Sequence, residues 1–320
     1  MHPHGSRIIS NGKIFMPPRS NLDQVGTGRA TLTGFSAVLM WSLLAALTVA
    51  TGRVPPFQLA ALCFTIGGGL GLIWTLVRGE AGLFARQPAK VWLHGIGGIF
   101  GYHFLYFTAL RHGSPAEVSL IAYLWPLLIV LLSVLLPGHQ LRKHHLAGAL
   151  LGFAGAVVIV RGSGGGTVQT DLVGYAAAVA CALIWSGYSV SARLLVQVPT
   201  ALVTGVCLIS AVLAAFCHLL FESTVWPAGS AAWLAVLALG AGPVGVAFYL
   251  WDYGCKHGDL RVLGGAAYLA PLLSTAVLLV FGLDRPRLSI VVAAVLITVG
   301  ALVAARDLIQ TASGRSSTVR

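Results

Sequence analysis

The chain has 320 residues, of which 57% are hydrophobic and only 9% are charged. Lys and Arg number 20 and Asp and Glu only 9, so the formal net charge is +11, and the mean hydropathy is +0.86. An average soluble domain is about 25% charged, and nucleic-acid-binding domains cluster their cations. The composition therefore excludes a water-soluble enzyme, a disordered chain and a nucleic-acid-binding domain, and it predicts an integral membrane protein.

Residues 1–29 contain several Pro and Gly residues and predict an unstructured tail, within which Met16 is an alternative start. A helix that rises about 1.5 Å per residue needs roughly 20 apolar residues to cross a bilayer core. The chain offers ten such segments, which are apolar all round and so disfavour a β-barrel. They are Ala30–Ala50, Phe57–Val77, Val91–Leu110, Pro115–Leu136, His145–Val160, Leu172–Ala192, Thr200–Leu220, Trp233–Trp251, Leu260–Phe281 and Ser289–Ala305.

The loops between these segments differ in positive charge. If the N-terminus is cytoplasmic, 15 of the 20 cations fall inside and 5 fall outside. The outside group is Arg53, Arg111, Arg161, Arg285 and Arg287. Since cytoplasmic loops carry an excess of Lys and Arg, we expect both termini on the cytoplasmic side of a bacterial inner membrane.

The two halves of the chain resemble each other at a constant spacing. The stretch Ala109–Gly113 matches Gly254–Gly258 with a separation of 145 positions. The same spacing relates Tyr123 to Tyr268, Pro126 to Pro271 and Gly155 to Gly300. We therefore expect a first repeat over 30–160, a Gly-rich linker over 161–171, a second repeat over 172–305 and a cytoplasmic tail over 306–320.

Each repeat would hold five helices, so the second repeat enters the membrane inverted relative to the first. Inverted repeats are typical of secondary transporters with a binding site near the bilayer midplane. With its two five-helix repeats and its Tyr-Leu…Pro-Leu pattern at Tyr123–Leu127 and Tyr268–Leu272, the chain resembles the EamA-type branch of the drug/metabolite transporter superfamily. Within that branch the likeness is nearest to bacterial exporters of aromatic amino acids, which implies an all-α fold of ten membrane helices and amino-acid export.

Motifs for catalysis are weak. The Gly-rich stretch after Arg161 lacks the Gly-Lys-Ser/Thr ending of a P-loop, and the nine acids, Asp252 among them, fall in tails, loops or near span ends. The cysteines, which show no CxxC spacing, predict buried small apolar residues rather than disulfides or a metal site. We expect neither catalytic residues, nor a metal, nor a cofactor. The five cysteines are Cys63, Cys181, Cys207, Cys217 and Cys255.

Aromatic residues divide by depth in the spans. Trp and Tyr favour the membrane interfaces, and six fit that position: Trp74, Trp92, Trp226, Trp233, Trp251 and Tyr253. Others fall nearer the middle of a span, where their polar groups need a partner or a polar cavity. We expect a central substrate site lined by Trp41, Tyr102, His103, Tyr123, Trp125, Trp185, Tyr188 and Tyr268. Ordinary packing between helices is the alternative for each of them.

Pro126 and Pro271 occupy equivalent mid-span positions. Proline removes a helical hydrogen bond and bends the helix, so these two residues predict either hinges of mirrored gates or static bends.

The prediction is a secondary transporter that exports small amphiphilic metabolites, amino acids and aromatic ones included, by alternating access. We expect it to act as a monomer in the lipid bilayer on a small-molecule substrate, with no nucleic-acid partner. Three alternatives remain: a carrier of another metabolite or drug-like solute, a channel, and a membrane-embedded lipid-modifying enzyme. The enzyme would use the polar groups near Arg111–His112 and Lys256–Asp259.

Overall fold

A computed structural model of the chain describes residues 8–10, 13–15, 21–112, 118, 121–137, 141–162, 171–280, 282, 288–304 and 306. Most of the expected linker (163–170), the outside cations Arg285 and Arg287, and tail residues 307–320 lie outside the described residues. The tail expected to be unstructured contains two short antiparallel strands, β1 (Ile8–Ser10) and β2 (Lys13–Phe15). The rest of the described chain is helical.

The first half contains six described α-helices and two short 3-10 helices, η1 (Ala81–Leu83) and η2 (Ser133–Leu135). Helix α1 begins at Asn21, before the expected boundary at Ala30, so the last part of the expected tail is helical. The α-helices are α1 (Asn21–Trp41), α2 (Leu44–Ala50), α3 (Pro56–Val77), α4 (Ala89–Arg111), α6 (Trp125–Leu132) and α7 (Lys143–Gly162).

The second half contains seven α-helices among its described residues, together with the 3-10 helix η3 (Ala192–Leu195) and the π-helical turn η4 (Gly242–Val246). The α-helices are α8 (Leu172–Ser191), α9 (Leu202–Phe221), α10 (Gly229–Ala241), α11 (Ala247–His257), α12 (Leu260–Ala267), α13 (Leu269–Val280) and α14 (Leu288–Ala304).

Several expected spans are interrupted rather than continuous. Proline explains one break, since Pro243 has no N–H and lies inside η4, which separates α10 from α11. A second break lies at Tyr268, between α12 and α13, three residues before Pro271. The expected span Ala30–Ala50 is divided at Ser42, where the backbone tightens and Leu43 N donates to the carbonyl of Met40.

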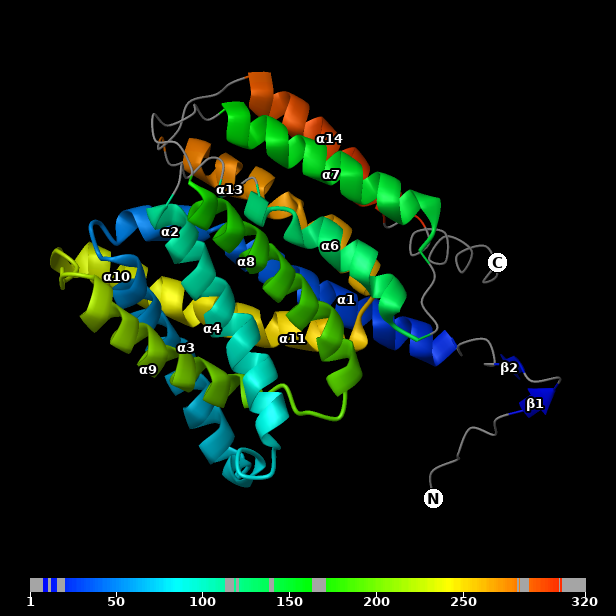
Figure 1. The fold of residues 1–320 in the computed structure, drawn as a ribbon, viewed down its shortest axis with the longest axis horizontal. Coiled ribbons are helices and arrows are strands. Elements are labelled where there is room, and N and C mark those ends of the chain that lie inside the picture. Colours follow the sequence, from blue (N-terminus) through cyan, green and yellow to red (C-terminus); the bar gives the residue numbers. More distant parts are fainter. Residues whose placement is uncertain are drawn as a thin grey trace, which may run out of the picture.

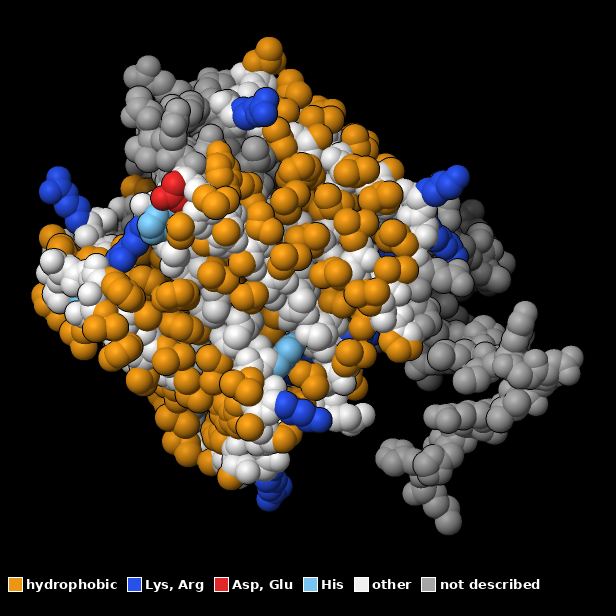
Figure 2. Space-filling view, in the orientation of Figure 1, with side chains coloured by type: hydrophobic (Ala, Val, Ile, Leu, Met, Phe, Trp, Pro, Cys, Tyr) orange, Lys and Arg blue, Asp and Glu red, His pale blue; other side chains and the backbone are white. Residues whose placement is uncertain are grey.

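Within the described residues, five helical segments are long and apolar enough to cross a membrane: Gly26–Ala50, Pro56–Val77, Leu172–Leu195, Leu202–Phe221 and Gly229–His257. Three shorter apolar helices accompany them. Figure 2 shows hydrophobic side chains over the middle of the visible face, with Lys and Arg at its periphery. Large apolar residues such as Leu172, Val77 and Val280 are each 82% exposed. A surface this apolar requires lipid rather than water as its solvent.

Helices from the two halves pair with each other throughout the bundle. The most extensive contacts join α7 to α14, α3 to α9, α4 to α8, α1 to α11, and α6 to α12. Figure 1 shows α7 and α14 side by side at one edge of the bundle and α1 passing through its middle. The core is therefore an interface between the halves, and a site at its centre draws residues from both.

Candidate functional site

A cavity of about 630 Å³ lies at the centre of this interface. Its size falls in the range of small-molecule sites. Six of the eight residues predicted from the sequence line it. They are Trp41 from α1, Tyr102 and His103 from α4, Tyr123 and Trp125 at the start of α6, and Trp185 from α8.

One end of the cavity lies where α2 joins α3, and we call it the mouth because its lining residues Val49 and Pro56 are exposed. Thr48 and Val49 at the end of α2, Pro56 at the start of α3 and Leu110 at the end of α4 line the cavity there. Beside this end, the buried carboxylate of Glu222 accepts hydrogen bonds from Phe57 N at 3.0 Å and from Arg111 at 3.3 Å. A carboxylate is favourable at a helix N-terminus because the first N–H groups of the helix lack partners.

The other end of the cavity is closed by four tryptophans, which we call the Trp floor: Trp41, Trp125, Trp185 and Trp251. The ring centroids of Trp41 and Trp251 are 5.1 Å apart, those of Trp41 and Trp185 are 5.7 Å apart, and those of Trp125 and Trp251 are 5.6 Å apart. Tilted and edge-on arrangements at these distances are favourable for aromatic rings. Trp41, Trp125 and Trp185 line the cavity, and Trp251 packs against all three from the side away from it.

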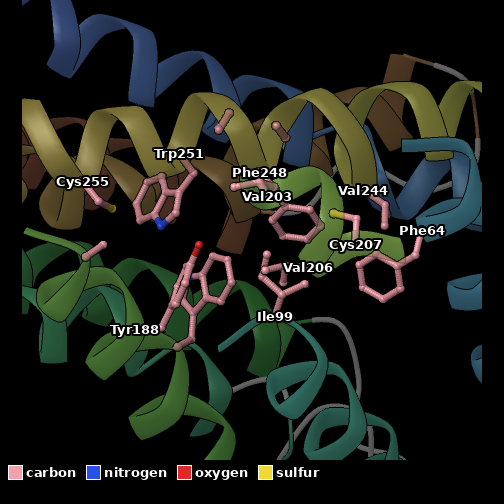
Figure 3. Packing of buried hydrophobic residues seen from close by; sticks show 14 of the residues in the cluster. Phe64, Ile99, Tyr188, Val203, Val206, Cys207, Val244, Phe248, Trp251 and Cys255 are labelled. Carbon is pink, nitrogen blue, oxygen red and sulfur yellow. The ribbon is translucent and has the colours of Figure 1, made fainter. Parts of the chain in front are cut away.

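Trp251 corrects a sequence prediction. We expected it at a membrane interface, but it is fully buried and its Nε1 donates to Ser189 Oγ at 3.0 Å. Figure 3 shows Trp251 from α11 and Tyr188 from α8 reaching toward each other. The expected span ended at Trp251, whereas α11 continues to His257. Within this continuation, Asp252 and Lys256 form a buried ion pair, so neither charge is left unpaired.

The π-helical turn η4 is a second feature that sequence reasoning missed. Pro243 and Val244 of this turn line the cavity, and the Pro243 carbonyl accepts a hydrogen bond from Trp41 Nε1 at 2.9 Å. Single π-turns inside α-helices occur frequently at functional sites. The sequence signal was Gly242-Pro243 in the middle of an apolar span.

His103 supplies a polar atom to the cavity. Its Nδ1 lies 2.7 Å from the carbonyl oxygen of Ile99, which can only accept a hydrogen bond, so Nδ1 carries the proton. In the neutral imidazole, Nε2 is then a hydrogen-bond acceptor. The rings of Phe64, Phe107 and Phe248 surround the imidazole at centroid distances of 5.1 to 6.1 Å. The surrounding rings fix its orientation.

Tyrosines line the wall near His103. Tyr102 stacks on Tyr106 with an interplanar angle of 4°, and its ring lies 5.3 Å from that of Trp185. Tyr106, which also lines the cavity, was not among the predicted residues, although it follows Tyr102 by one helical turn. The phenol groups add hydroxyls to a wall of aromatic and aliphatic side chains.

Two predicted residues do not line the cavity. Tyr188 lies beyond the Trp floor, between Trp185 and His94, at ring distances of 5.4 and 5.0 Å. Tyr268 is fully buried against α7, and its hydroxyl accepts the backbone N–H of Leu127 at 3.2 Å. The structure thus places the repeat-related pair Tyr123 and Tyr268 differently.

The cavity lining contains no Asp, Glu, Lys or Arg among the described residues. Its polar groups are hydroxyls, indole N–H groups, one imidazole, the Cys63 thiol and backbone atoms. In the described part of the chain, no three His, Cys, Asp or Glu side chains lie close enough to hold a metal ion. The lining can bind by ring contacts and by uncharged hydrogen bonds.

The cysteine prediction is confirmed. All five cysteines are free and buried, and one of them, Cys63, lines the cavity.

Comparison with known proteins gives concordant matches. The profile of the EamA-like transporter family matches residues 28–161 and again residues 172–306. A protein of Ancylobacter novellus named aromatic amino acid exporter YddG is 56% identical over 277 residues, covering 86% of this chain and 96% of that protein. A protein of Salmonella typhimurium with the same name is 25% identical over 287 residues. A crystal structure that is 56% identical superposes with a TM-score of 0.81, covering 86% of this chain and 98% of that one.

Proposed function

Because the chain belongs to the EamA-like transporter family, we propose that it exports small amphiphilic amino acids, aromatic ones included, by alternating access. The observation that carries this proposal is the cavity, whose lining combines aromatic rings with aliphatic side chains and, among the described residues, has no charged side chain. Such a wall favours an apolar or aromatic side chain. The name of the Ancylobacter novellus relative supports the same substrate class.

The fold we propose is ten membrane helices in two inverted repeats, 30–160 and 172–305, joined by the linker 161–171. The helix contacts support the inversion. If α1 corresponds to α8 and α4 to the α10–α11 segment, exchanging the repeats converts the α1–α11 contact into the α8–α4 contact. The contacts of α3 with α9 and of α7 with α14 convert into themselves. A pseudo-two-fold axis in the membrane plane has this property.

The distribution of cations supports the proposed orientation. With 15 of 20 cations on one side, the positive-inside rule places tails 1–29 and 306–320 in the cytoplasm of a bacterial cell. The mouth at the α2–α3 junction, which carries Arg53, then faces outward, and the Trp floor closes the cytoplasmic side. The chain would work as a monomer in the inner membrane. The conformation in the structure would be the outward-open state of its cycle.

The cycle needs elements that bend. The breaks near Tyr123–Leu124 and at Tyr268 lie within three residues of Pro126 and Pro271, and η4 supplies a third break in α10–α11. We propose that Pro126 and Pro271 act as hinges, with rocking of the repeats closing the mouth and separating the Trp floor. Tyr102, His103, Tyr123, Trp41, Trp125 and Trp185 would contact the bound substrate, and Tyr188 and Tyr268 would act from outside the cavity.

Alanine variants test the site. We expect Tyr102→Ala and Tyr123→Ala to reduce counterflow of labelled Phe in proteoliposomes at least tenfold, because each removes an aromatic ring that lines the cavity. Tyr253→Ala is the matched control, since Tyr253 is 42% exposed and does not line the cavity. Wild-type counterflow in both cavity variants would remove these residues from the site, and counterflow of other solutes but not of amino acids would refute the substrate class.

A further inference from the structure

A buried layer of charged residues lies beyond the Trp floor. Lys256 Nζ and Asp252 Oδ2, one turn apart on α11, are 2.7 Å apart, and the two side chains are 4% and 6% exposed. Thr200 Oγ1 donates to the same carboxylate oxygen at 2.6 Å, and Lys256 also donates to the carbonyl of Val198 at 2.9 Å. Both charges are thus held inside the protein by partners from the η3–α9 connection.

This layer lies between the Trp floor and the proposed cytoplasmic side, on the route that a substrate would take to reach the cavity from the cytoplasm. Along α11, Phe248 lines the cavity, Trp251 belongs to the floor, and Lys256 follows about 12 Å beyond Phe248 at ~1.5 Å per residue. Across from it, His94 Nε2 of α4 lies 2.7 Å from Ser191 Oγ of α8. Arg193 of η3 donates to the carbonyls of Lys256 and Gly258. The layer joins the ends of helices from both halves.

Stability alone does not account for such a pair. Desolvating two charges costs about as much as their attraction returns, and apolar residues of similar volume often serve as well. Ionisable residues at membrane depth commonly mark the pathway of a polar solute. An amino acid carries two opposite charges, but no charged side chain among the described residues of the cavity can pair with either of them.

We propose that Asp252 and Lys256 form a cytoplasmic capture site for the charged α-carbon end of an amino acid. This inference rests on the proposed function. When α11 separates from α8 and η3, Lys256 binds the α-carboxylate and Asp252 the α-ammonium. When the floor closes behind the substrate, the two side chains bind each other again, as they do in the structure. The same pair therefore recognises the zwitterion and seals the cytoplasmic end.

The site predicts a specific dependence on ligand charge. Phenylalanine carries both charges, 3-phenylpropionate only the carboxylate, and 2-phenylethylamine only the ammonium. Removing the Lys256 charge should weaken the binding of phenylalanine and of 3-phenylpropionate. Removing the Asp252 charge should weaken the binding of phenylalanine and of 2-phenylethylamine. If the pair only held the cytoplasmic end closed, its removal would change the equilibrium between closed and open states. The half-inhibitory concentrations of all three ligands would then change by the same factor.

The experiment measures inhibition of labelled Phe counterflow by these three ligands, applied from the cytoplasmic side of oriented proteoliposomes. For Lys256→Gln we expect the half-inhibitory concentration of phenylalanine and of phenylpropionate to rise at least tenfold and that of phenylethylamine to change less than twofold. For Asp252→Asn the roles of the two analogues should exchange. The double variant Asp252→Asn/Lys256→Gln buries no unpaired charge and can replace a single variant that does not fold. It should lose the preference for the carboxylate and the preference for the ammonium group.

Two exposed residues provide matched controls, Lys90→Gln and Glu80→Gln, and both should match the wild type. Equal shifts for all three ligands, or no shift in the charge variants, would overturn the capture site while leaving the export function intact. Absence of Phe counterflow in the wild-type protein would instead refute the proposed function, and the capture site with it.

Discussion

At the scale of single residues, the two repeat-related tyrosines serve different purposes. Tyr123 lines the cavity, while Tyr268 is fully buried and accepts the backbone N–H of Leu127 at 3.2 Å. That N–H would otherwise donate to the Tyr123 carbonyl within a regular α-helix. The Tyr268 hydroxyl therefore supplies an acceptor for this N–H at the break ahead of α6.

Removing this hydroxyl tests the assignment. We expect Tyr268→Phe to lower the stability of the purified protein by about 1–3 kcal/mol, because it leaves a buried N–H without an acceptor. The half-saturating Phe concentration should stay within twofold, since Tyr268 does not line the cavity. Thermal unfolding in detergent and counterflow check the two expectations, with the exposed Tyr253→Phe as control. A changed half-saturating concentration at unchanged stability would mean that Tyr268 contacts substrate.

Depth in a span indicated which residues meet at the cavity, while their contact with substrate stays a prediction. Six of the eight predicted residues surround the cavity because mid-span Trp, Tyr and His side chains need a polar neighbour. The sequence prediction was wrong for Trp251, because charges at Asp252 and Lys256 suggested the end of a span. Their spacing of four residues was the available signal, since it allows the two side chains to pair on one helix face.

At the scale of helices, close approach between the halves depends on particular glycines. A Cβ added at Gly148 of α7 would lie 2.5 Å from the carbonyl oxygen of Gly300 of α14. The seam between these two helices is among the most extensive in the bundle. By contrast, a Cβ at Gly97 of α4 would meet no atom within 4 Å.

The two glycines form a matched pair of tests. Gly148→Ala should destabilise the protein by about 1–3 kcal/mol, because an overpacked seam forces the helices apart. Gly97→Ala should leave stability unchanged or raise it by up to about 1 kcal/mol, because alanine is the better helix former. Thermal unfolding in detergent measures both effects. Equal destabilisation by the two variants would contradict the claim that the close approach of α7 and α14 depends on Gly148.

The start of α8 is capped by Asp171, which lies outside the membrane-spanning segments. Its Oδ1 accepts the N–H of Gly174 at 2.8 Å, and its Oδ2 lies 3.0 Å from His112 Nδ1. The N–H of Gly174, and then His112, hold the pKa of this carboxyl below its usual range. The cap therefore ties the beginning of α8 to the end of α4.

A lowered pKa in the folded state fixes the sign of the pH dependence. The stabilisation by Asp171 is fully present above the unfolded pKa of about 3.9 and is lost as the pH falls through the lower folded value. Asp171→Asn, which cannot titrate, should show a smaller fall in apparent Tm than the wild type between about pH 5 and 2. Parallel curves for the two proteins would contradict this role.

At the scale of the whole molecule, the sequence predicted a helical membrane fold with similar halves. The spacing of 145 positions was visible because prolines, tyrosines and glycines at bends and seams are hard to replace. The break at η4 had a signal in Gly242-Pro243, whereas the break at Ser42 had none, because it shows only in the local hydrogen bond from Leu43 N to the Met40 carbonyl. The closed Trp floor was equally hidden, since Trp251 and Trp41 are far apart in sequence and meet only when the halves pack.

The central claim is that the cavity belongs to a carrier that moves amino acids. The most direct measurement is counterflow of labelled L-phenylalanine into proteoliposomes that contain the purified wild-type protein and an excess of unlabelled Phe. The account predicts transient, saturable accumulation that depends on the internal amino acid. No accumulation above protein-free liposomes, or flux that never saturates, would contradict it.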